Sequence, residues 1–165
     1  MQILDTKQIN QKIKRLSFEI MENHYAEKEI YLAGINNNGF DFAKLLKSQL
    51  GKISEIDFKL CRLNINPAQP TQHDISLSID ENDLKNKVII VIDDVANTGR
   101  TIFYAFKPLL NVIPKKIEVA VLVDRKHKSY PVEVNYMGLS LATTLKENIR
   151  VSIQKASERA VYLED

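Results

Sequence analysis

A run of five apolar residues that ends at two adjacent carboxylates most constrains the fold of this chain. The run covers residues 88–92 and reads Val-Ile-Ile-Val-Ile, and Asp93 and Asp94 follow it. It has no alternation of apolar and polar side chains, which is typical of a central strand covered on both faces in a parallel sheet. In open α/β sheets, ligands bind outside the carboxyl ends of such strands. The two carboxylates therefore stand where a ligand site is expected.

A short polar turn follows these carboxylates and opens an amphipathic stretch that extends to Leu110. The turn contains Thr98, Gly99, Arg100 and Thr101. Free N–H groups at the start of a helix favour a phosphate. Carboxylates beside a phosphate are compatible with it if they accept hydrogen bonds from ribose hydroxyls or face a divalent metal. A ribose 5-phosphate meets both demands. The alternative is an ordinary strand-to-helix corner that an Asp or Thr side chain caps.

The rest of the chain predicts an α/β fold with a central, mainly parallel sheet. Helical spacing of apolar residues is found over residues 6–25, 42–50 and 102–110. Strands are expected at residues 30–35, 56–60, 76–80, 88–92 and 119–123, and short strand-like segments at 132–136, 149–153 and 160–163. Because strands alternate with helices, we expect parallel pairing with right-handed crossovers. With 165 residues, 44% of them hydrophobic, we expect one domain over residues 1–165.

The overall composition excludes several classes of protein. A net charge of +2 gives no general attraction for nucleic acid, so any RNA binding has to come from a local patch. Cys61 is the only cysteine, which rules out an intramolecular disulfide and suits a reducing compartment. No apolar run approaches the ~18 residues of a membrane span. We therefore expect a cytoplasmic protein without a membrane partner.

The motif VIIVIDDVANTGRT at residues 88–101 resembles the motif that binds 5-phosphoribosyl-1-pyrophosphate (PRPP) in the type I phosphoribosyltransferases. Four more stretches, in the same order as in that family, are similar to its pyrimidine-operon regulators, which are also uracil phosphoribosyltransferases. They are residues 4–24, 31–46, 55–62 and 120–143. The resemblance implies the type I phosphoribosyltransferase fold, with helices flanking the sheet, a small hood and a mobile loop. It also implies Mg²⁺ as cofactor and a homodimer or larger assembly.

The resemblance assigns roles to individual residues. Asp93 and Asp94 would bind the ribose hydroxyls, directly or through water on Mg²⁺, and Arg62 would join them as the catalytic set. The 5′-phosphate would be wrapped by Ala96, Asn97, Thr98, Gly99, Arg100 and Thr101. The pyrophosphate loop would be Ile35, Asn36, Asn37, Asn38 and Gly39, where a non-proline cis peptide often occurs in the family. The base would contact Val123, Asp124, Arg125 and His127.

Arg62 stands at the mouth of the expected mobile loop, residues 63–76, and would reach the pyrophosphate. Closure of this loop would keep water away from the reacting sugar. Each assignment has a plainer alternative. Arg62 is equally a solvated charge at a strand end, and residues 36–38 make an ordinary turn, because Asn tolerates positive φ. The basic residues around His127 are equally a solvated charge cluster.

Two departures from the family pattern affect the expected chemistry. Purine-specific relatives tend to have an Asp where Asn97 stands, and the pyrimidine regulators have a Tyr. Because an amide cannot act as a general base, Asn97 favours uracil, converted to UMP, over a purine as acceptor. The regulators also carry Lys-Thr-Arg-Gly at residues 36–39 and Arg-Asp-Asp at residues 62–64. Two cations and two acids are missing here, so the alternative is a PRPP or nucleotide sensor with little turnover.

An RNA-binding attenuation regulator is a further alternative. The regulators of this family use a basic dimer face that includes the first helix and positions near the C-terminus. Positive charge is kept there at Lys14, Arg15, Lys146 and Arg150, whereas Phe18 replaces a histidine. Four basic residues on a surface usually serve solubility alone, so RNA binding is not favoured.

Overall fold

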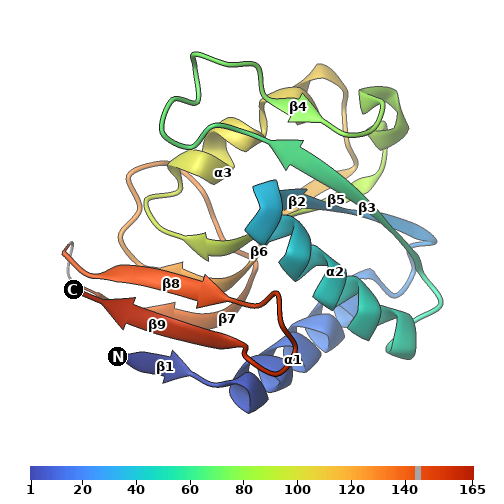
Figure 1. The fold of residues 1–165 in the computed structure, drawn as a ribbon. Coiled ribbons are helices and arrows are strands. Elements are labelled where there is room, and N and C mark those ends of the chain that lie inside the picture. Colours follow the sequence, from blue (N-terminus) through green and yellow to red (C-terminus); the bar gives the residue numbers. More distant parts are fainter. Residues whose placement is uncertain (144–145) are drawn as a thin grey trace.

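The computed structural model of the protein describes residues 1–143 and 146–165. A six-stranded sheet with the order β4-β3-β2-β5-β6-β7 lies at its centre (Figure 1). Its strands are β2 (Glu29–Ile35), β3 (Asp57–Asn64), β4 (Ser76–Leu77), β5 (Val88–Ala96), β6 (Lys116–Arg125) and β7 (Tyr136–Leu141). Every neighbouring pair is parallel except β3 with β4. The predicted α/β fold with a mainly parallel sheet is confirmed.

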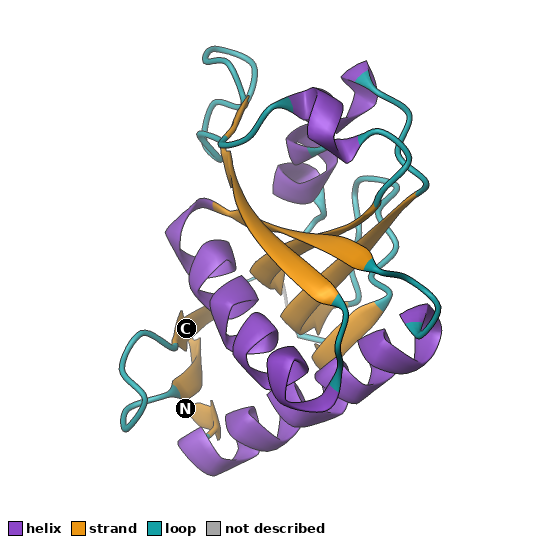
Figure 2. Cartoon of the chain, turned by 90° about the vertical axis from the view of Figure 1, so that its right-hand side faces the viewer, coloured by secondary structure: helices purple, strands orange, loops and turns teal. Residues whose placement is uncertain are grey.

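Helices cover both faces of this sheet, with the two long helices on one side and the short ones on the other (Figure 2). The elements are α1 (Thr6–His24), α2 (Asn36–Ile53), α3 (Arg100–Ala105) and two short 3₁₀ segments, η1 (Glu81–Leu84) and η2 (Lys107–Asn111). Ile90 and Ile92 of β5 join the core beneath α1 and α2. Ile89 and Val91 join the core beneath α3. Burial on both faces explains why the run at residues 88–92 is continuously apolar.

A second, three-stranded sheet joins the two ends of the chain. It has the order β1-β9-β8, with β1 at Gln2–Leu4, β8 at Asn148–Ser152 and β9 at Ala160–Glu164. Both pairings are antiparallel, and the N-terminal amine of Met1 donates to the carbonyl oxygen of Leu163 at 2.6 Å. Figure 1 accordingly places the two termini close together. This sheet is the small hood that the family resemblance implies.

Several sequence-based boundaries are wrong, including those of three segments. The strand expected at residues 132–136 begins only at Tyr136, because Val132 packs against the turn at Gly99 and Val134 enters the core beneath α3. The helix expected to run to residue 110 ends at Ala105, since Pro108 cannot donate a backbone hydrogen bond and η2 follows instead. The strand expected at 76–80 is limited to Ser76–Leu77.

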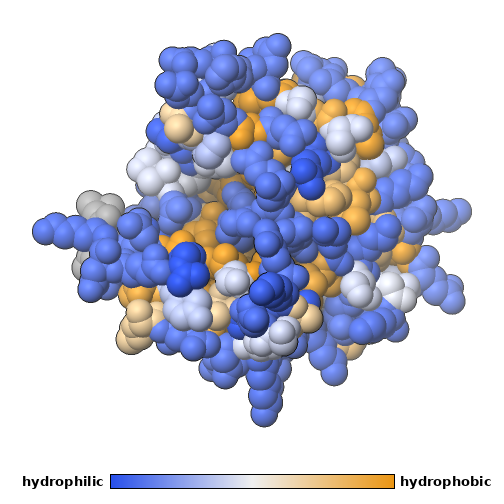
Figure 3. Space-filling view, in the orientation of Figure 1, coloured by the Kyte–Doolittle hydropathy of each residue, from blue (hydrophilic) through white to orange (hydrophobic). Residues whose placement is uncertain are grey.

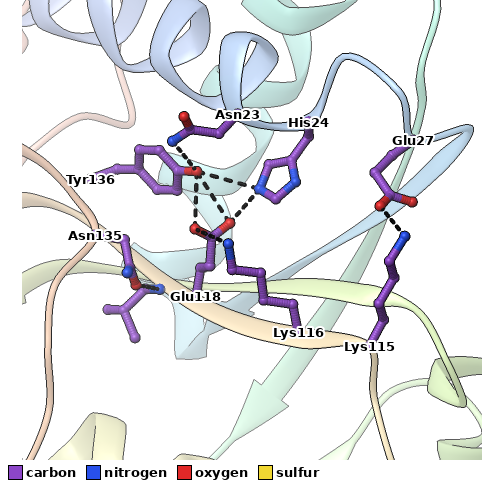
Figure 4. A network of polar contacts seen from close by, with 9 residues as sticks. Asn23, His24, Glu27, Lys115, Lys116, Glu118, Asn135 and Tyr136 are labelled. Atoms are coloured by element: carbon purple, nitrogen blue, oxygen red, sulfur yellow. Dashed lines mark hydrogen bonds and ion pairs between the residues drawn. The ribbon is translucent and has the colours of Figure 1, made fainter.

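A buried polar network lies near the amino end of β6, away from the carboxyl ends of the strands (Figure 4). A ring nitrogen of His24, at the end of α1, contacts the carboxylate of Glu118, and both side chains are about 5% exposed. The hydroxyl of Tyr136 donates to this carboxylate at 3.1 Å and accepts from Asn23 at 3.0 Å. Lys116 lies 3.6 Å from the second carboxylate oxygen. The network joins α1 to the sheet through paired rather than isolated buried charge.

Candidate active site

A cleft of about 450 Å³ opens at the carboxyl ends of β2 and β5. Its walls come from the start of α2, the end of β5, the following turn, the loop after β3, and the hood. The lining residues are Ile35, Asn36, Asn37, Asn38, Pro67, Asp93, Asp94, Val95, Asn97, Thr101 and Ile149. Eight of the eighteen predicted site residues therefore lie around one cleft. The face of the molecule drawn in Figure 3 is largely hydrophilic, with hydrophobic residues visible mainly in its middle.

The acidic pair, Asp93 and Asp94, forms one wall of the cleft. The backbone N–H of Asp94 donates to Oδ1 of Asp93 at 2.9 Å, and Nδ2 of Asn38 donates to Oδ2 of Asp94 at 3.0 Å. Burial, together with the charge of Asp94, raises the pKa of Asp93 well above its ordinary range. Two adjacent carboxylates of this kind are suited to accept hydrogen bonds from hydroxyls or to face a cation.

The Asn turn, residues 36–39, is the first turn of α2 and not a separate loop as predicted. Asn36 adopts φ 51°, a conformation that Asn tolerates. A Cβ added to Gly34 would lie 2.4 Å from Cα of Phe40, and one added to Gly39 would lie 2.5 Å from the carbonyl oxygen of Ile92. These two glycines let the helix start directly against β2 and β5. No cis peptide bond occurs among the described residues, so the family's frequent cis peptide is not found at this turn.

The lid loop, residues 65–75, is held to both sides of the cleft. Nδ2 of Asn36 donates to the carbonyl of Ile65 at 2.9 Å, and the N–H of Ile65 donates to Oδ1 of Asn36 at 3.0 Å. On the other side, a guanidinium nitrogen of Arg100 donates to the carbonyl of Pro67 at 2.8 Å. The segment predicted to be mobile therefore lies against the cleft through three hydrogen bonds.

Arg62 lies beside the cleft and does not line it. A guanidinium nitrogen donates to Oδ1 of Asn37 at 3.3 Å, and the guanidinium carbon lies 4.4 Å from the centre of the Phe40 ring. Among the described residues, no Lys or Arg lines this cleft. The cation predicted for the pyrophosphate is thus held at the rim by an aromatic ring and an amide.

The phosphate turn, residues 96–101, encloses a pocket of about 40 Å³ next to the main cleft. Gly99 adopts φ 87°, which strains any side chain, and a Cβ there would also meet Val132 at 3.3 Å. The carbonyl of Thr98 accepts from the N–H groups of Ser129 and Tyr130 at 2.9 and 3.1 Å. The backbone of the phosphate turn is therefore held in place by the segment after β6.

The four residues predicted to bind the base do not line the cleft. Val123 is fully buried in the core, and Asp124 accepts from Lys128 at 2.5 Å. His127 is exposed. The side chain of Arg125 contacts a cleft residue, donating through Nη1 to Oδ1 of Asn97 at 3.2 Å. Its Nε also donates to Oγ1 of Thr143 at 2.7 Å.

Sequence reasoning missed three residues of the cleft, which are Pro67, Val95 and Ile149. Val95 follows the acidic pair directly, so its position in β5 signalled its place. Ile149 belongs to the hood and Pro67 to the lid loop, and both reach the cleft only through tertiary packing. The hood contributes an apolar side chain where no local pattern indicated one.

Two of the basic residues considered for RNA binding already make contacts within the protein. Arg15 pairs with Glu19 at 2.6 Å and donates to the carbonyls of Met137 and Gly138, at the edge of the main sheet. The guanidinium of Arg150 lies 4.4 Å from the centre of the Tyr162 ring and pairs with Glu164 at 2.6 Å. These contacts give both arginines a structural role.

Two features are absent from the residues that the structure describes, a cluster of metal-binding side chains and a membrane-spanning helix. No group of three or more His, Cys, Asp or Glu side chains in this part of the chain is arranged to hold a metal ion. No helix there is both long and apolar enough to span a bilayer.

Comparisons with known proteins agree with this geometry. The family model described as phosphoribosyl transferase domain matches residues 1–155. A protein named Bifunctional protein PyrR from Haemophilus ducreyi is 35% identical, over 90% of this chain and 87% of its own length. One of the same name from Pediococcus pentosaceus is 30% identical, over 98% of this chain and 97% of its own.

Solved structures show the same fold. A hypoxanthine-guanine phosphoribosyltransferase from Bacillus anthracis superposes with a TM-score of 0.74 at 20% identity, covering 90% of this chain and 84% of that one. A hypoxanthine phosphoribosyltransferase from Trypanosoma cruzi gives a TM-score of 0.73 at 13% identity, with coverage of 87% and 78%. The chain belongs to the phosphoribosyl transferase domain family, the type I phosphoribosyltransferases.

Proposed function

We propose that this protein transfers the phosphoribosyl group of PRPP to uracil, giving UMP and pyrophosphate. The observation that carries this proposal is the single cleft shared by the acidic pair, the start of α2 and the phosphate turn. Uracil is favoured by the resemblance to the pyrimidine-operon regulators and by Asn97. Because an amide does not take up a proton, Asn97 cannot act as a general base toward a purine nitrogen. The reaction would serve pyrimidine salvage in the cytoplasm.

The transfer breaks the bond between C1 of the ribose and the pyrophosphate oxygen, and it forms a bond from C1 to a uracil nitrogen. The proton of that nitrogen would pass to the departing pyrophosphate or to water. Between these two bond changes, positive charge develops on the sugar. Asp93 and Asp94 would accept hydrogen bonds from the ribose hydroxyls and stabilise that charge. The phosphate turn would hold the 5′-phosphate at the helix N-terminus. Positioning between these two groups accounts for most of the expected rate enhancement.

The donor set of the cleft fits Mg²⁺. This ion is usually held by one or two carboxylates together with substrate phosphates and water, so a cluster of three protein ligands is not required. Asp93 and Asp94 lie side by side in the cleft, and no Lys or Arg is among the described residues that line it. The two carboxylates therefore match that need. When bound, Mg²⁺ would neutralise the charge of the pyrophosphate group.

The lid loop would exclude water while the sugar is reactive. Its contacts with Asn36 and Arg100 tie it to the two sides of the cleft between which PRPP would lie. Attack by water on C1 would consume PRPP without making a nucleotide, so closure protects the substrate. The family resemblance further implies a homodimer or larger assembly, which sedimentation of the purified protein would test.

A second candidate function is a PRPP or nucleotide sensor with little turnover. It is favoured by the absence of Lys and Arg among the described residues that line the cleft. Two carboxylates facing a diphosphate without protein cations make its binding costly. RNA attenuation has less support, because Arg15 and Arg150 are occupied within the protein.

The test is a panel of radiolabelled uracil, hypoxanthine, guanine and cytosine, each with PRPP and Mg²⁺. We expect label in UMP alone; a purine nucleotide as the main product would contradict the uracil assignment. PRPP binding is measured in parallel by calorimetry for the wild type, for Asp94→Asn and for the control Asp57→Asn. Asp57 is an exposed carboxylate at the other end of the sheet.

Loss of one charge-assisted contact should weaken PRPP binding about tenfold or more in Asp94→Asn. Equal PRPP affinity in Asp94→Asn and Asp57→Asn would remove the acidic pair from the site. PRPP binding without product from any base would favour the sensor.

A further inference from the structure

The side chain of Asn97, a predicted phosphate-binding residue, is held by a side chain outside the cleft. It is exposed and lines the cleft. Its Oδ1 accepts from Nη1 of Arg125 at 3.2 Å, and Arg125 is itself fixed at Nε by Thr143. Arg125 lies at the carboxyl end of β6. The amide of Asn97 is therefore oriented from the side of the cleft where a base is expected.

This contact decides which end of the amide faces the ligand. A guanidinium only donates hydrogen bonds, so the atom of Asn97 that faces Arg125 has to be the oxygen. The nitrogen Nδ2, which carries two hydrogens, is turned away from Arg125. Within the part of the chain that the structure describes, Nδ2 of Asn97 donates to no other group. The cleft thus gains a donor at this position.

We infer that Nδ2 of Asn97 donates to a carbonyl oxygen of the base and thereby selects an oxo-pyrimidine over a base that presents an N–H at the same point. The inference rests on the proposed function, because it assumes that a base lies between β6 and the acidic pair. It gives Asn97 a role in base selection in place of phosphate binding. Arg125 acts as the positioning residue that fixes the amide.

The experiment compares UMP with ribose 5-phosphate, which lacks the base, by calorimetry. The ratio of their affinities measures what the base contributes, and it needs no turnover. Asn97→Asp replaces the donor by an acceptor of the same shape. Asn37→Asp is the matched control, since it places the same charge on the opposite wall, where Asn37 contacts Arg62.

In Asn97→Asp we expect the preference for UMP over ribose 5-phosphate to fall about tenfold, from the loss of one hydrogen bond and the facing of two acceptors. In Asn37→Asp the ratio should stay as in the wild type, even if both ligands bind more weakly. Equal weakening of both ligands in Asn97→Asp would show that Asn97 serves the phosphate, and it would overturn the inference. So would a wild type that binds UMP no better than ribose 5-phosphate.

The same samples separate this inference from the proposed function. Incubation of the wild type with uracil, PRPP and Mg²⁺ reports on transferase activity alone. If the UMP to ribose 5-phosphate affinity ratio falls as expected in Asn97→Asp but the wild type forms no UMP, base selection by Asn97 is supported and the transferase is refuted. If the wild type forms UMP but the affinity ratio is unchanged in Asn97→Asp, the transferase is supported and base selection by Asn97 is refuted.

Discussion

The amide nitrogen of Asn38 lies 3.0 Å from a carboxylate oxygen of Asp94, so a neutral donor joins the start of α2 to the acidic pair. The pyrimidine regulators that this chain resembles carry an Arg at the position of Asn38. The contact satisfies one oxygen of Asp94 but adds no positive charge to the cleft. If the cleft binds PRPP as proposed, the electrostatic cost of a diphosphate beside two carboxylates would therefore fall to Mg²⁺ and to Arg62 at the rim.

Asn38→Arg should strengthen PRPP binding, because it places a guanidinium within reach of the pyrophosphate. A bidentate contact of this kind is worth about tenfold in affinity or more. Calorimetric titration with PRPP and Mg²⁺ measures the effect. Ser48→Arg is the control, since it adds the same charge at an exposed position of the same helix. Equal affinities for the two variants would mean that residue 38 does not face the pyrophosphate.

Asp93→Asn should make the protein more stable, and the gain should grow with pH. Burial and the charge of Asp94 raise the pKa of Asp93 above its ordinary value of 3.8, so the folded state favours the neutral carboxyl. Below pH 3.8, Asp93 is protonated in both the folded and the unfolded state, so Asp93→Asn gives no gain in stability. As the pH rises past it, the unfolded chain ionises first and wild-type stability falls.

Urea unfolding across the acidic to neutral range tests this. Asp74→Asn is the control because Asp74 is exposed. A gain that is already complete at the acid end would contradict the assigned cause. PRPP binding should be lost in the same Asp93→Asn protein, since the carboxylate that destabilises the folded state is the one proposed to hold the ribose.

Asn36→Gly should loosen the lid loop without disturbing the start of α2. Glycine accepts the φ of 51° but removes both hydrogen bonds to Ile65. We expect a loss of about 1 to 2 kcal/mol in local stability, and faster hydrogen exchange over residues 63–76. Asn86→Gly is the matched control, because Asn86 also has positive φ, 59°, and lies outside the cleft. If both variants exchange at the wild-type rate in this segment, Asn36 does not hold the lid.

Glu118→Gln should destabilise the protein by about 1 to 3 kcal/mol at neutral pH, because it breaks a buried hydrogen-bonded pair. Burial alone would raise the pKa of Glu118, but the hydrogen bond and charge of His24 outweigh it and lower the pKa below its ordinary value of 4.5. The stabilisation is therefore present above that value and is lost as the pH falls through the lowered pKa. Wild type and variant should converge in acid.

Thermal or urea unfolding at several pH values checks this prediction. Glu158→Gln removes a carboxylate that is 64% exposed and pairs with Lys155, and it should change stability by less than about 0.5 kcal/mol. A constant difference between Glu118→Gln and wild type at all pH values would argue against ionic pairing with His24.

Local patterns in the sequence predicted the elements that depend on local physics. The run at residues 88–92 predicted β5 because a doubly covered strand has to be apolar throughout, and the spacing of apolar residues predicted α1. Asp93 and Asp94 follow this run near the carboxyl end of β5, where ligands of open α/β sheets bind, and they do line the cleft. These inferences needed only the periodicity of one segment at a time.

Features that depend on distant segments were not predicted. The contact of His24 with Glu118 joins residues 94 positions apart, and neither has a neighbour in the sequence that signals it. Ile149 enters the cleft because β8 pairs with β9, and β9 pairs with β1. Helix α2 begins at Asn36 because two glycines allow backbone contacts with Phe40 and Ile92, which no pattern within residues 36–39 reveals.

The pairing of β1 with β9 has a consequence for how the protein is made. A chain emerging from the ribosome can assemble β2, α2 and β5 as they appear, but Gln2 finds its partner only after Tyr162 has been made. Contacts between such distant segments form slowly because the intervening loop has to close. The hood, and with it the wall that carries Ile149, should thus be the last part of the cleft to form. Nascent protein would lack this wall of the cleft until β9 has been made.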